Sequence, residues 1–207
     1  MIILAQSASS SQMQTLDPTI MLAGIVISLI LVAATSLLLQ KRARRSRSSY
    51  LARAMIGVPE IMQIHATERE GAIREMVRFA ARMVRTIDEE TLMHAVLLRE
   101  SDMSTGLAHG IAVPHARLTK LNRSLALFGR SARGIPWECL DDKPAEMIFL
   151  ILSPEDDAQE QLHMLAEIGH CADDVDCLEL LRNATDCRTI TRAIENKADG
   201  RKRRQQK

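Results

Sequence analysis

The stretch that decides how this chain folds and reacts runs from Arg99 to Arg117 and reads RESDMSTGLAHGIAVPHAR. Two glycines and a proline within it predict a backbone that turns tightly before it presents His115. A neutral imidazole, whose ordinary pKa is about 6.5, is a good nucleophile near neutral pH. An arginine such as Arg99 can hold a phosphoryl group by two parallel hydrogen bonds. We therefore interpret this stretch as a reactive loop with His115 at its centre.

The order of residues in this loop resembles the signature of a known family. Arg-Glu, Ser-Thr-Gly and Gly-Ile-Ala-Val-Pro-His-Ala-Arg follow one another as in the active sites of type-2 enzyme IIA domains of the bacterial phosphotransferase system, the fructose, mannitol and nitrogen-regulatory class. The similarity continues through residues 134–137, 141–144 and 161–165, and it covers about residues 55–198. The resemblance implies an α/β fold with a mixed central sheet flanked by helices.

The resemblance also implies roles for five side chains. His115 would carry the phosphoryl group and His163 matches the second histidine of the family, so these two are the candidate catalytic residues. Arg99, Ser104 and Thr105 are the candidate phosphate-binding residues, through guanidinium, hydroxyl or backbone donors. Simpler readings stay open: His115 as a histidine that only stabilises a loop, Arg99 as a cation at a helix end, and His163 as a surface histidine.

The family's chemistry implies which partners the chain would have. A histidine phosphocarrier protein would deliver the phosphoryl group, which originates in phosphoenolpyruvate and passes through enzyme I, and no cofactor is needed. The group would then move to a IIB domain. In the alternative function, its presence on the chain controls a membrane transporter, channel or kinase without sugar phosphorylation. A scaffold that is never phosphorylated is disfavoured, because the matched site residues are all present.

A metal site is a further alternative for the histidines. His94, His109 and His115 could in principle bind zinc together, but nothing in their spacing favours it, and we predict no metal. The turn at Asp141 and Asp142 departs from the family, since an aspartate stands where a glycine is common. That departure would alter the turn without touching the histidine.

The N-terminal part of the chain predicts a membrane anchor. Residues 20–40 carry no charge, and as a helix that rises about 1.5 Å per residue they would cross the roughly 30 Å hydrocarbon core of a bilayer. Five basic residues lie between Lys41 and Arg47 and none precedes the span, so the positive-inside rule places the rest of the chain in the cytoplasm. We expect a single-pass protein of the inner membrane. A cleaved signal peptide and a buried soluble helix are the alternatives.

The sequence thus divides into five expected segments. They are a short extracytoplasmic tail (1–19), the transmembrane helix (20–40), a basic juxtamembrane linker (41–54), the enzyme IIA domain (55–198) and a charged, disordered tail (199–207). Within the domain we expect strands at 60–65, 111–113, 125–128 and 145–152. We expect helices from a Thr67–Glu70 capping box to Arg85, from Asp88 to Arg99, after Pro154, and around 174–182 and 186–195.

Composition excludes other classes of function. The 27 basic and 26 acidic residues nearly cancel, and aromatic residues are scarce, so we expect no nucleic-acid partner. The four cysteines contain no C-x-x-C pair, and we expect free thiols, as is usual in the cytosol.

Overall fold

The computed structural model describes residues 27–28, 30–33, 35 and 49–205, with side chains through 197. The chain divides into two units, residues 1–46 and residues 47–207. The described residues of the first unit are helical, and the apolar side chains of Ile27, Ile30, Leu31 and Val32 are exposed. Among the described residues, no helix is both long and apolar enough to cross a membrane. The expected span at 20–40 lies largely outside these residues, and the expected tail at 1–19 lies wholly outside them.

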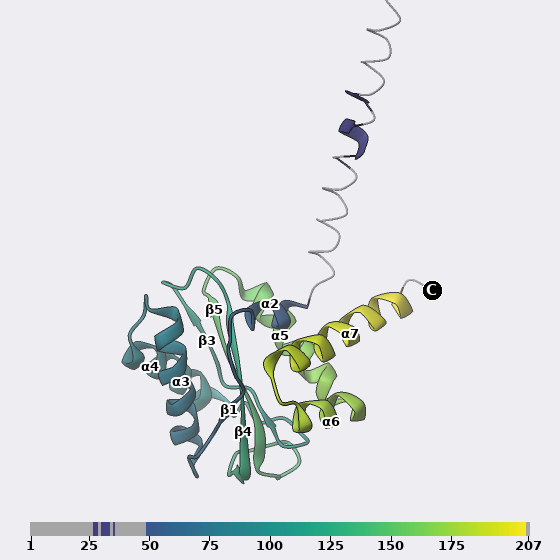
Figure 1. Ribbon diagram of the computed structural model, residues 1–207. Coiled ribbons are helices and arrows are strands. Elements are labelled where there is room, and N and C mark those ends of the chain that lie inside the picture. Colours follow the sequence, from purple (N-terminus) through teal and green to yellow (C-terminus); the bar gives the residue numbers. More distant parts are fainter. Residues whose placement is uncertain (1–26, 29, 34, 36–48, 206–207) are drawn as a thin grey trace, which may run out of the picture. The chain divides into compact units, whose positions relative to one another are not determined.

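The second unit is built on one mixed sheet (Figure 1). Its strands are β1 (Met62–Gln63), β2 (Ile111–Ala112), β3 (His115–Leu118), β4 (Leu125–Ile135) and β5 (Ala145–Pro154). The order is β1-β4-β5-β2, and β3 also pairs with β5, beyond β2 along the same edge. Of these four strand pairs, β4–β5 alone is antiparallel. The expected mixed sheet is therefore confirmed, while β3, which starts at His115 itself, was not expected as a strand.

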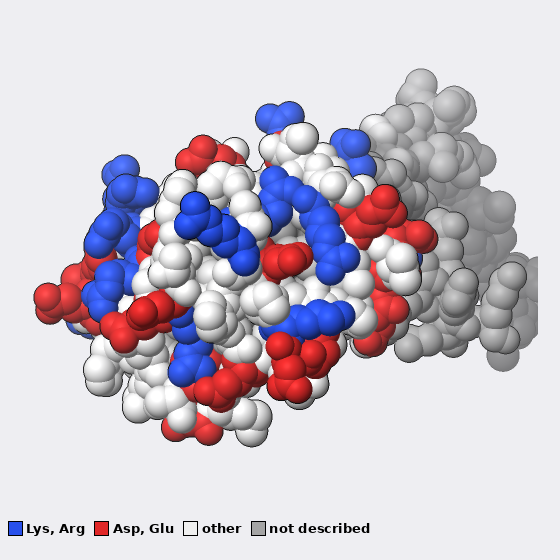
Figure 2. Space-filling view, turned by 90° about the horizontal axis from the view of Figure 1, so that it is seen from below, with Lys and Arg blue, Asp and Glu red and all other residues white. Residues whose placement is uncertain are grey.

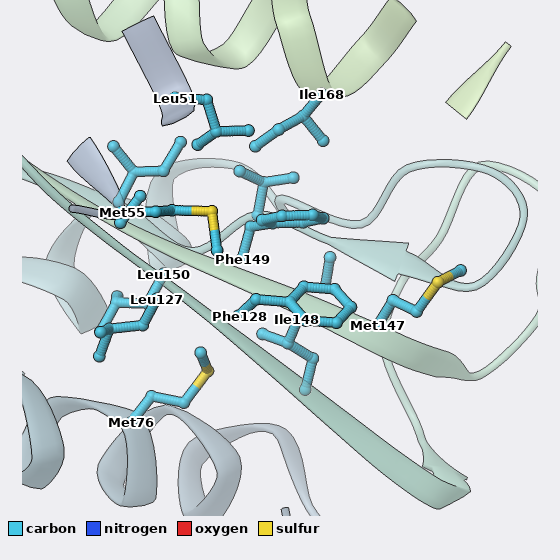
Figure 3. Packing of buried hydrophobic residues seen from close by; sticks show 14 of the residues in the cluster. Leu51, Met55, Met76, Leu127, Phe128, Met147, Ile148, Phe149, Leu150 and Ile168 are labelled. Carbon is cyan, nitrogen blue, oxygen red and sulfur yellow. The ribbon is translucent and has the colours of Figure 1, made fainter. Parts of the chain in front are cut away.

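Helices cover both faces of the sheet (Figure 1). On one face lie α3 (Arg69–Val84) and α4 (Glu89–Asp102). On the other lie α2 (Tyr50–Ala54), α5 (Ala158–Ala172), α6 (Val175–Asn183) and α7 (Cys187–Gln205). Figure 3 shows Leu51 and Ile168 on the side of the sheet toward which Phe149 projects, and Met76 on the opposite side. The apolar core thus has two halves, one on each face of the sheet.

The starts of the helices differ in how well the sequence predicts them. Asp88 caps α4 as expected, since its Oδ1 accepts a hydrogen bond from the Thr91 N–H at 2.8 Å. The expected Thr67–Glu70 capping box is wrong, because α3 begins at Arg69 and its N-cap residue makes no side-chain hydrogen bond. Instead the carboxylate of Glu75, six residues into the helix, accepts the backbone N–H groups of His65 and Ala66, which precede the helix.

Residues that the sequence assigns to a linker form part of the folded unit. Helix α2 lies within the expected linker at 41–54, and its Leu51 is fully buried. A single carboxylate of α5 holds the start of α2: Glu167 accepts Ser49 Oγ at 2.7 Å, the Tyr50 N–H at 3.0 Å and the Leu51 N–H at 2.8 Å. By accepting from these three donors, the carboxylate satisfies N–H groups at the start of α2 that have no partner within a helix of five residues. The folded unit therefore begins before Met55.

The C-terminal helices show two further differences. Helix α7 runs to Gln205, into the stretch 199–207 that the sequence assigns to a disordered tail; lysine, arginine and glutamine are good helix formers. Cys171 and Cys177 form a disulfide, with their Cα atoms 5.4 Å apart, because α5 ends and α6 begins within six residues. Cys139 and Cys187 are free and buried, as expected.

In the view of Figure 2, basic and acidic side chains lie side by side across the face that is shown. A face that carries both positive and negative side chains agrees with the formal net charge of +1 of the whole chain.

We expect Glu167→Gln to lower the free energy of unfolding by about 1–3 kcal/mol. The amide offers one acceptor oxygen and turns an NH₂ group toward the donors of α2, so buried N–H groups lose their partners. Urea unfolding of the full chain, followed through the fluorescence of the single tryptophan, measures the change. Glu179→Gln on α6, an exposed glutamate, is the matched control and should stay within about 0.5 kcal/mol of the parent. Equal midpoints for the two variants would show that the carboxylate does not hold α2.

Candidate functional site

His115 occupies the first position of β3 and is almost completely buried. Its Nδ1 lies 2.8 Å from the carbonyl oxygen of Val113. Because a carbonyl only accepts hydrogen bonds, Nδ1 must carry the proton, and Nε2 keeps its lone pair. That lone pair faces the Nε–H of Arg99 at 3.1 Å. The backbone of the strand start therefore fixes the tautomer and leaves Nε2 as the nucleophilic atom.

The surroundings keep the His115 imidazole neutral. Burial lowers the pKa of His115 below the ordinary value of 6.5, and the nearby positive charges of Arg99 and Arg117 lower it further. The hydrogen bond to Val113 and the negative charge of Glu100 act in the opposite direction, but the net shift is downward. The ring is consequently uncharged at neutral pH, as a nitrogen nucleophile requires.

Arg99 reaches His115 from the last turn of α4. Its Nη1 donates to the carbonyl oxygen of Met103 at 3.0 Å, at the C-terminal end of the helix, while its Nε donates to the imidazole. The guanidinium thus contacts both the end of α4 and the imidazole. From the sequence alone, a cation at the helix end and a group beside the histidine were alternative roles for Arg99. It is half-buried, so its position is held while one edge stays accessible.

The next residue, Glu100, is a buried carboxylate that organises the loop around the histidine. Its Oε1 accepts from the Trp137 indole N–H at 3.0 Å and from the Thr105 N–H at 3.1 Å, and its Oε2 accepts from Thr105 Oγ1 at 2.5 Å. Nη1 of Arg69 lies 3.7 Å from Oε1 of Glu100 and supplies a positive charge. We assigned no role to Glu100 or Trp137 from the sequence. The available signal was that Leu92, Val96 and Glu100 share the buried stripe of α4.

The two predicted hydroxyl donors, Ser104 and Thr105, therefore differ in how firmly their hydroxyl groups are already bonded. Thr105 is buried, and both its N–H and its hydroxyl already donate to Glu100. Ser104 is partly exposed and its hydroxyl has only long contacts, each of 3.5 Å, to Glu100 and to the Gly106 N–H. Ser104 is free to turn toward a ligand at small cost, whereas Thr105 holds the loop.

Gly106 is needed where this loop crosses a second segment of the chain. A Cβ atom at this position would lie 2.7 Å from the carbonyl oxygen of Glu138 and 2.8 Å from Cα of Cys139. Those are backbone atoms that cannot move aside, so any larger residue would push the loop away from the histidine. Burial raises the pKa of the neighbouring Cys139 thiol to about 11, which keeps it protonated and unreactive.

His163 lies on α5 in contact with α2. Its ring stacks on Tyr50 of α2, with centroids 4.5 Å apart and planes inclined by 13°. Among the described contacts, none joins His163 to His115. Arg53 covers the Tyr50 ring as well, at 4.3 Å from its centroid. The structure brings together Arg99, Ser104, Thr105 and His115, and it places His163 in the contact between α2 and α5.

The turn after Trp137 contains Asp141 and Asp142, where the sequence departs from the family pattern. Asp142 has a φ of +57°, the left-handed conformation that glycine adopts most readily and aspartate tolerates. Asp141 accepts the His109 N–H at 2.9 Å, which ties this turn to the loop before β2. Within the part of the chain that the structure describes, no three histidine, cysteine or acidic residues are grouped so that they could hold a metal ion.

Comparisons with known proteins match most of the folded unit. The family model described as the phosphoenolpyruvate-dependent sugar phosphotransferase system, EIIA 2, matches residues 60–197. The fructose-specific EIIA component of that system from Haloferax volcanii is 33% identical over 122 residues, which are 59% of this chain and 79% of that protein. A nitrogen regulatory protein from Bradyrhizobium diazoefficiens is 31% identical over 127 residues, 61% of this chain and 82% of that protein.

The fold has solved counterparts as well. The crystal structure of the nitrogen regulatory protein IIA-Ntr from Neisseria meningitidis superposes with a TM-score of 0.60 at 21% identity, over 65% of this chain and 91% of that one. A similarity at this identity concerns the fold alone. The family model covers well over half of the chain and includes the whole loop around His115. The chain therefore belongs to the type-2 enzyme IIA family of the phosphoenolpyruvate-dependent sugar phosphotransferase system.

Proposed function

We propose that the chain accepts a phosphoryl group on Nε2 of His115 from a histidine phosphocarrier protein. The observation that carries the proposal is the pair of hydrogen bonds on the imidazole, Nδ1–H to Val113 and Nε2 facing Arg99. In the transfer, the Nε2 lone pair forms the new N–P bond while the N–P bond of the phosphocarrier breaks and its histidine leaves with the electron pair. Nε2 carries no proton, so His115 releases none, and Nδ1 keeps its bond to Val113 throughout.

Arg99 and Ser104 are suited to receive the transferred group. A phosphoryl group on Nε2 takes the place that the Arg99 Nε–H now contacts, so the guanidinium can turn its donors from the ring nitrogen to phosphoryl oxygens. The loosely bonded hydroxyl of Ser104 adds a neutral donor. Thr105 contributes by holding the loop through Glu100.

The surface beside the histidine suits docking of a protein partner. Leu98 and Met103 are exposed by 57% and 70%, and they flank Arg99 on α4 and at its end. Exposed apolar side chains next to a reacting group favour a partner that covers them while the phosphoryl group passes. The phosphocarrier is the donor in this proposal, and a IIB domain or a regulated membrane protein would be the next partner.

We also propose that the domain is held at the inner membrane by residues 20–40, with its C-terminal part in the cytoplasm. The support is the uncharged stretch itself, the five basic residues that follow it, and the exposed apolar side chains of the described residues between 27 and 32. A tether raises the effective concentration of the domain for membrane partners.

That tether, together with the similarity to nitrogen regulatory proteins, favours a second candidate function. In it, the phosphorylation state of His115 controls binding to a membrane transporter, channel or kinase. One measurement distinguishes the two functions. If the chain takes part in sugar phosphorylation, deleting it would lower the sugar phosphorylation catalysed by membranes. If it only regulates a membrane partner, that activity would stay unchanged.

Labelling of the full chain in detergent with radioactive phosphoenolpyruvate, enzyme I and the phosphocarrier tests the phosphorylation directly. We expect one acid-labile, base-stable phosphate per chain, and none on His115→Ala, which lacks the nucleophile. His163→Ala should be labelled as well as the parent, since its ring stacks on Tyr50. Trp137 fluorescence confirms that each variant is folded. Labelling of folded His115→Ala at the parental level would refute the assignment.

Arg99→Lys separates the two roles that arginine can have in the site. Lysine keeps the charge at the helix end but loses the planar fork that binds two oxygens. We expect the initial rate of phosphate transfer to fall roughly tenfold to 150-fold, the equivalent of about 1.5–3 kcal/mol for a lost charged donor. If Arg99→Lys and the parent have equal thermal stability and transfer phosphate at rates within a factor of two of each other, Arg99 acts only as a cation at the helix end.

The proposed topology predicts which engineered cysteines are accessible. A cysteine at Ser10 should react with an impermeant thiol reagent in intact cells, because the tail before the span would lie outside. A cysteine at Lys120, in the turn after β3, should react only after the cells are opened, because the domain would be cytoplasmic. The reverse pattern would put the domain outside and away from any phosphate donor.

A further inference from the structure

Helix α7 changes character along its length. Its first part packs on the folded unit through Ile190, Ala193 and Ile194, which are buried. The helix then continues from Glu195 to Gln205, about 16 Å at a rise of about 1.5 Å per residue. Figure 1 shows this end of α7 projecting past α6. The described core thus explains the first part of α7 and leaves its continuation without a stated purpose.

The continuation of α7 concentrates positive charge. Residues 201–204 read Arg-Lys-Arg-Arg, Lys207 follows, and the sequence has no acidic residue between 200 and 207. Lys197, just before this run, pairs with Asp174 at the start of α6, so its charge is compensated within the folded unit. A helix end favours a few cations, but basic residues three or four positions apart repel one another. A run of this density indicates an anionic partner.

Next to the first part of α7 lies a groove with an exposed apolar side chain. Ile56, in the turn after α2, lines the groove together with Arg188 of α7, and Ile56 is 64% exposed. Arg188 and Arg192 are both exposed and lie one turn apart on α7. Asp186 and Glu195 line the groove as well, and Asp186 caps the start of α7. An apolar side chain beside arginines is typical of surfaces that meet the boundary between lipid headgroups and acyl chains.

The same helix lies beside the point where the chain enters the folded unit. Helix α2 opens the unit and packs on α7. The expected transmembrane span ends at residue 40, so residues 41–48 alone separate it from Ser49, a reach of at most about 28 Å. A membrane that holds the anchor is therefore the anionic surface available to α7 at the highest effective concentration.

We propose that Ile56, Arg188, Arg192 and the basic end of α7 (201–204) together bind the anionic headgroups of a lipid bilayer. Each basic residue near an anionic leaflet adds roughly fivefold to the affinity, so the run acts as one strong contact. The proposal rests on the proposed membrane tether and adds to it a second attachment, which limits the rotation of the folded unit. Helix α4 covers the other face of the sheet, so Arg99 and His115 stay open to a soluble partner.

A fluorophore at the end of α7 tests the proposal in the full chain. Gln205→Cys can be labelled selectively, because the native cysteines are buried, and two of them form the disulfide. The labelled chain is placed in nanodiscs of phosphatidylcholine, without or with phosphatidylglycerol. We expect quenching by acrylamide, an uncharged quencher, to fall about threefold or more in the anionic discs, and to recover at high salt, which screens the attraction.

Charge removal separates the proposed surface from a general effect of positive charge. Changing all four basic residues of 201–204 to Gln should abolish the difference between the two kinds of disc. The matched control changes four exposed arginines of α3, on the other face of the sheet, to Gln: Arg74, Arg78, Arg82 and Arg85. This control should keep the parental difference, and Trp137 fluorescence verifies that both variants are folded. Equal quenching of the parent in the two discs, or a parental difference in the α7 variant, would overturn the proposal.

A second pair of labels tests whether the groove takes part. A fluorophore on Ile56→Cys should be quenched by brominated lipid in the anionic discs. A fluorophore on Leu140→Cys should not, because Leu140 is 81% exposed in the connection before β5, whereas the end of β5 and α2 line a common pocket. Equal quenching at the two positions would contradict the proposed surface.

The outcomes also distinguish this proposal from the tether and from a different class of partner. If the chain does not stay with discs of phosphatidylcholine alone, the tether at 20–40 is wrong, whatever α7 does. If it stays with them and the Gln205 label gives the same quenching in both discs, only the role of α7 is wrong. If short duplex DNA protects the label as strongly as anionic lipid does at equal phosphate concentration, the end of α7 binds polyanions in general, and the assignment to lipid is wrong.

Discussion

The site depends on one buried negative charge, the carboxylate of Glu100. A carboxylate away from water is unfavourable unless hydrogen bonds and an opposite charge compensate it. Here the compensation comes from Trp137, Thr105 and Arg69, which belong to three separate segments of the chain. Glu100 therefore fastens α4 to the loop at Thr105 and to the segment at Trp137. Arg99, its neighbour on the same helix, points elsewhere and meets the histidine.

The histidine itself is prepared by short-range geometry. The carbonyl of Val113, two residues earlier in the chain, holds the Nδ1 proton, so the nucleophilic atom is set by the way β3 begins. Burial and two arginines keep the ring neutral. The contacts of the imidazole thus come partly from its own strand and partly from the end of α4. Because both are regular elements, little reorganisation is needed before transfer.

Much of the fold and part of the site could be predicted from the sequence. The long apolar run of β5, the cap at Asp88 and the mixed sheet were correct, since each follows from a local pattern or from the family resemblance. Strand β3 was missed because glycine and proline around it indicate a loop. The position of His163 and the burial of α2 depend on contacts with residues more than a hundred positions away, such as Tyr50 with His163 and Ser49 with Glu167. No local pattern reports such contacts.

The three hydrogen bonds from Ser49, Tyr50 and Leu51 to Glu167 also determine how the domain bears mechanical load. Force applied to the chain ahead of Ser49 would reach α5 through one carboxylate, and it would reach β4 and α7 through the packing of α2. A pull on the N-terminal segment would thus load α5 at the carboxylate that holds the start of α2.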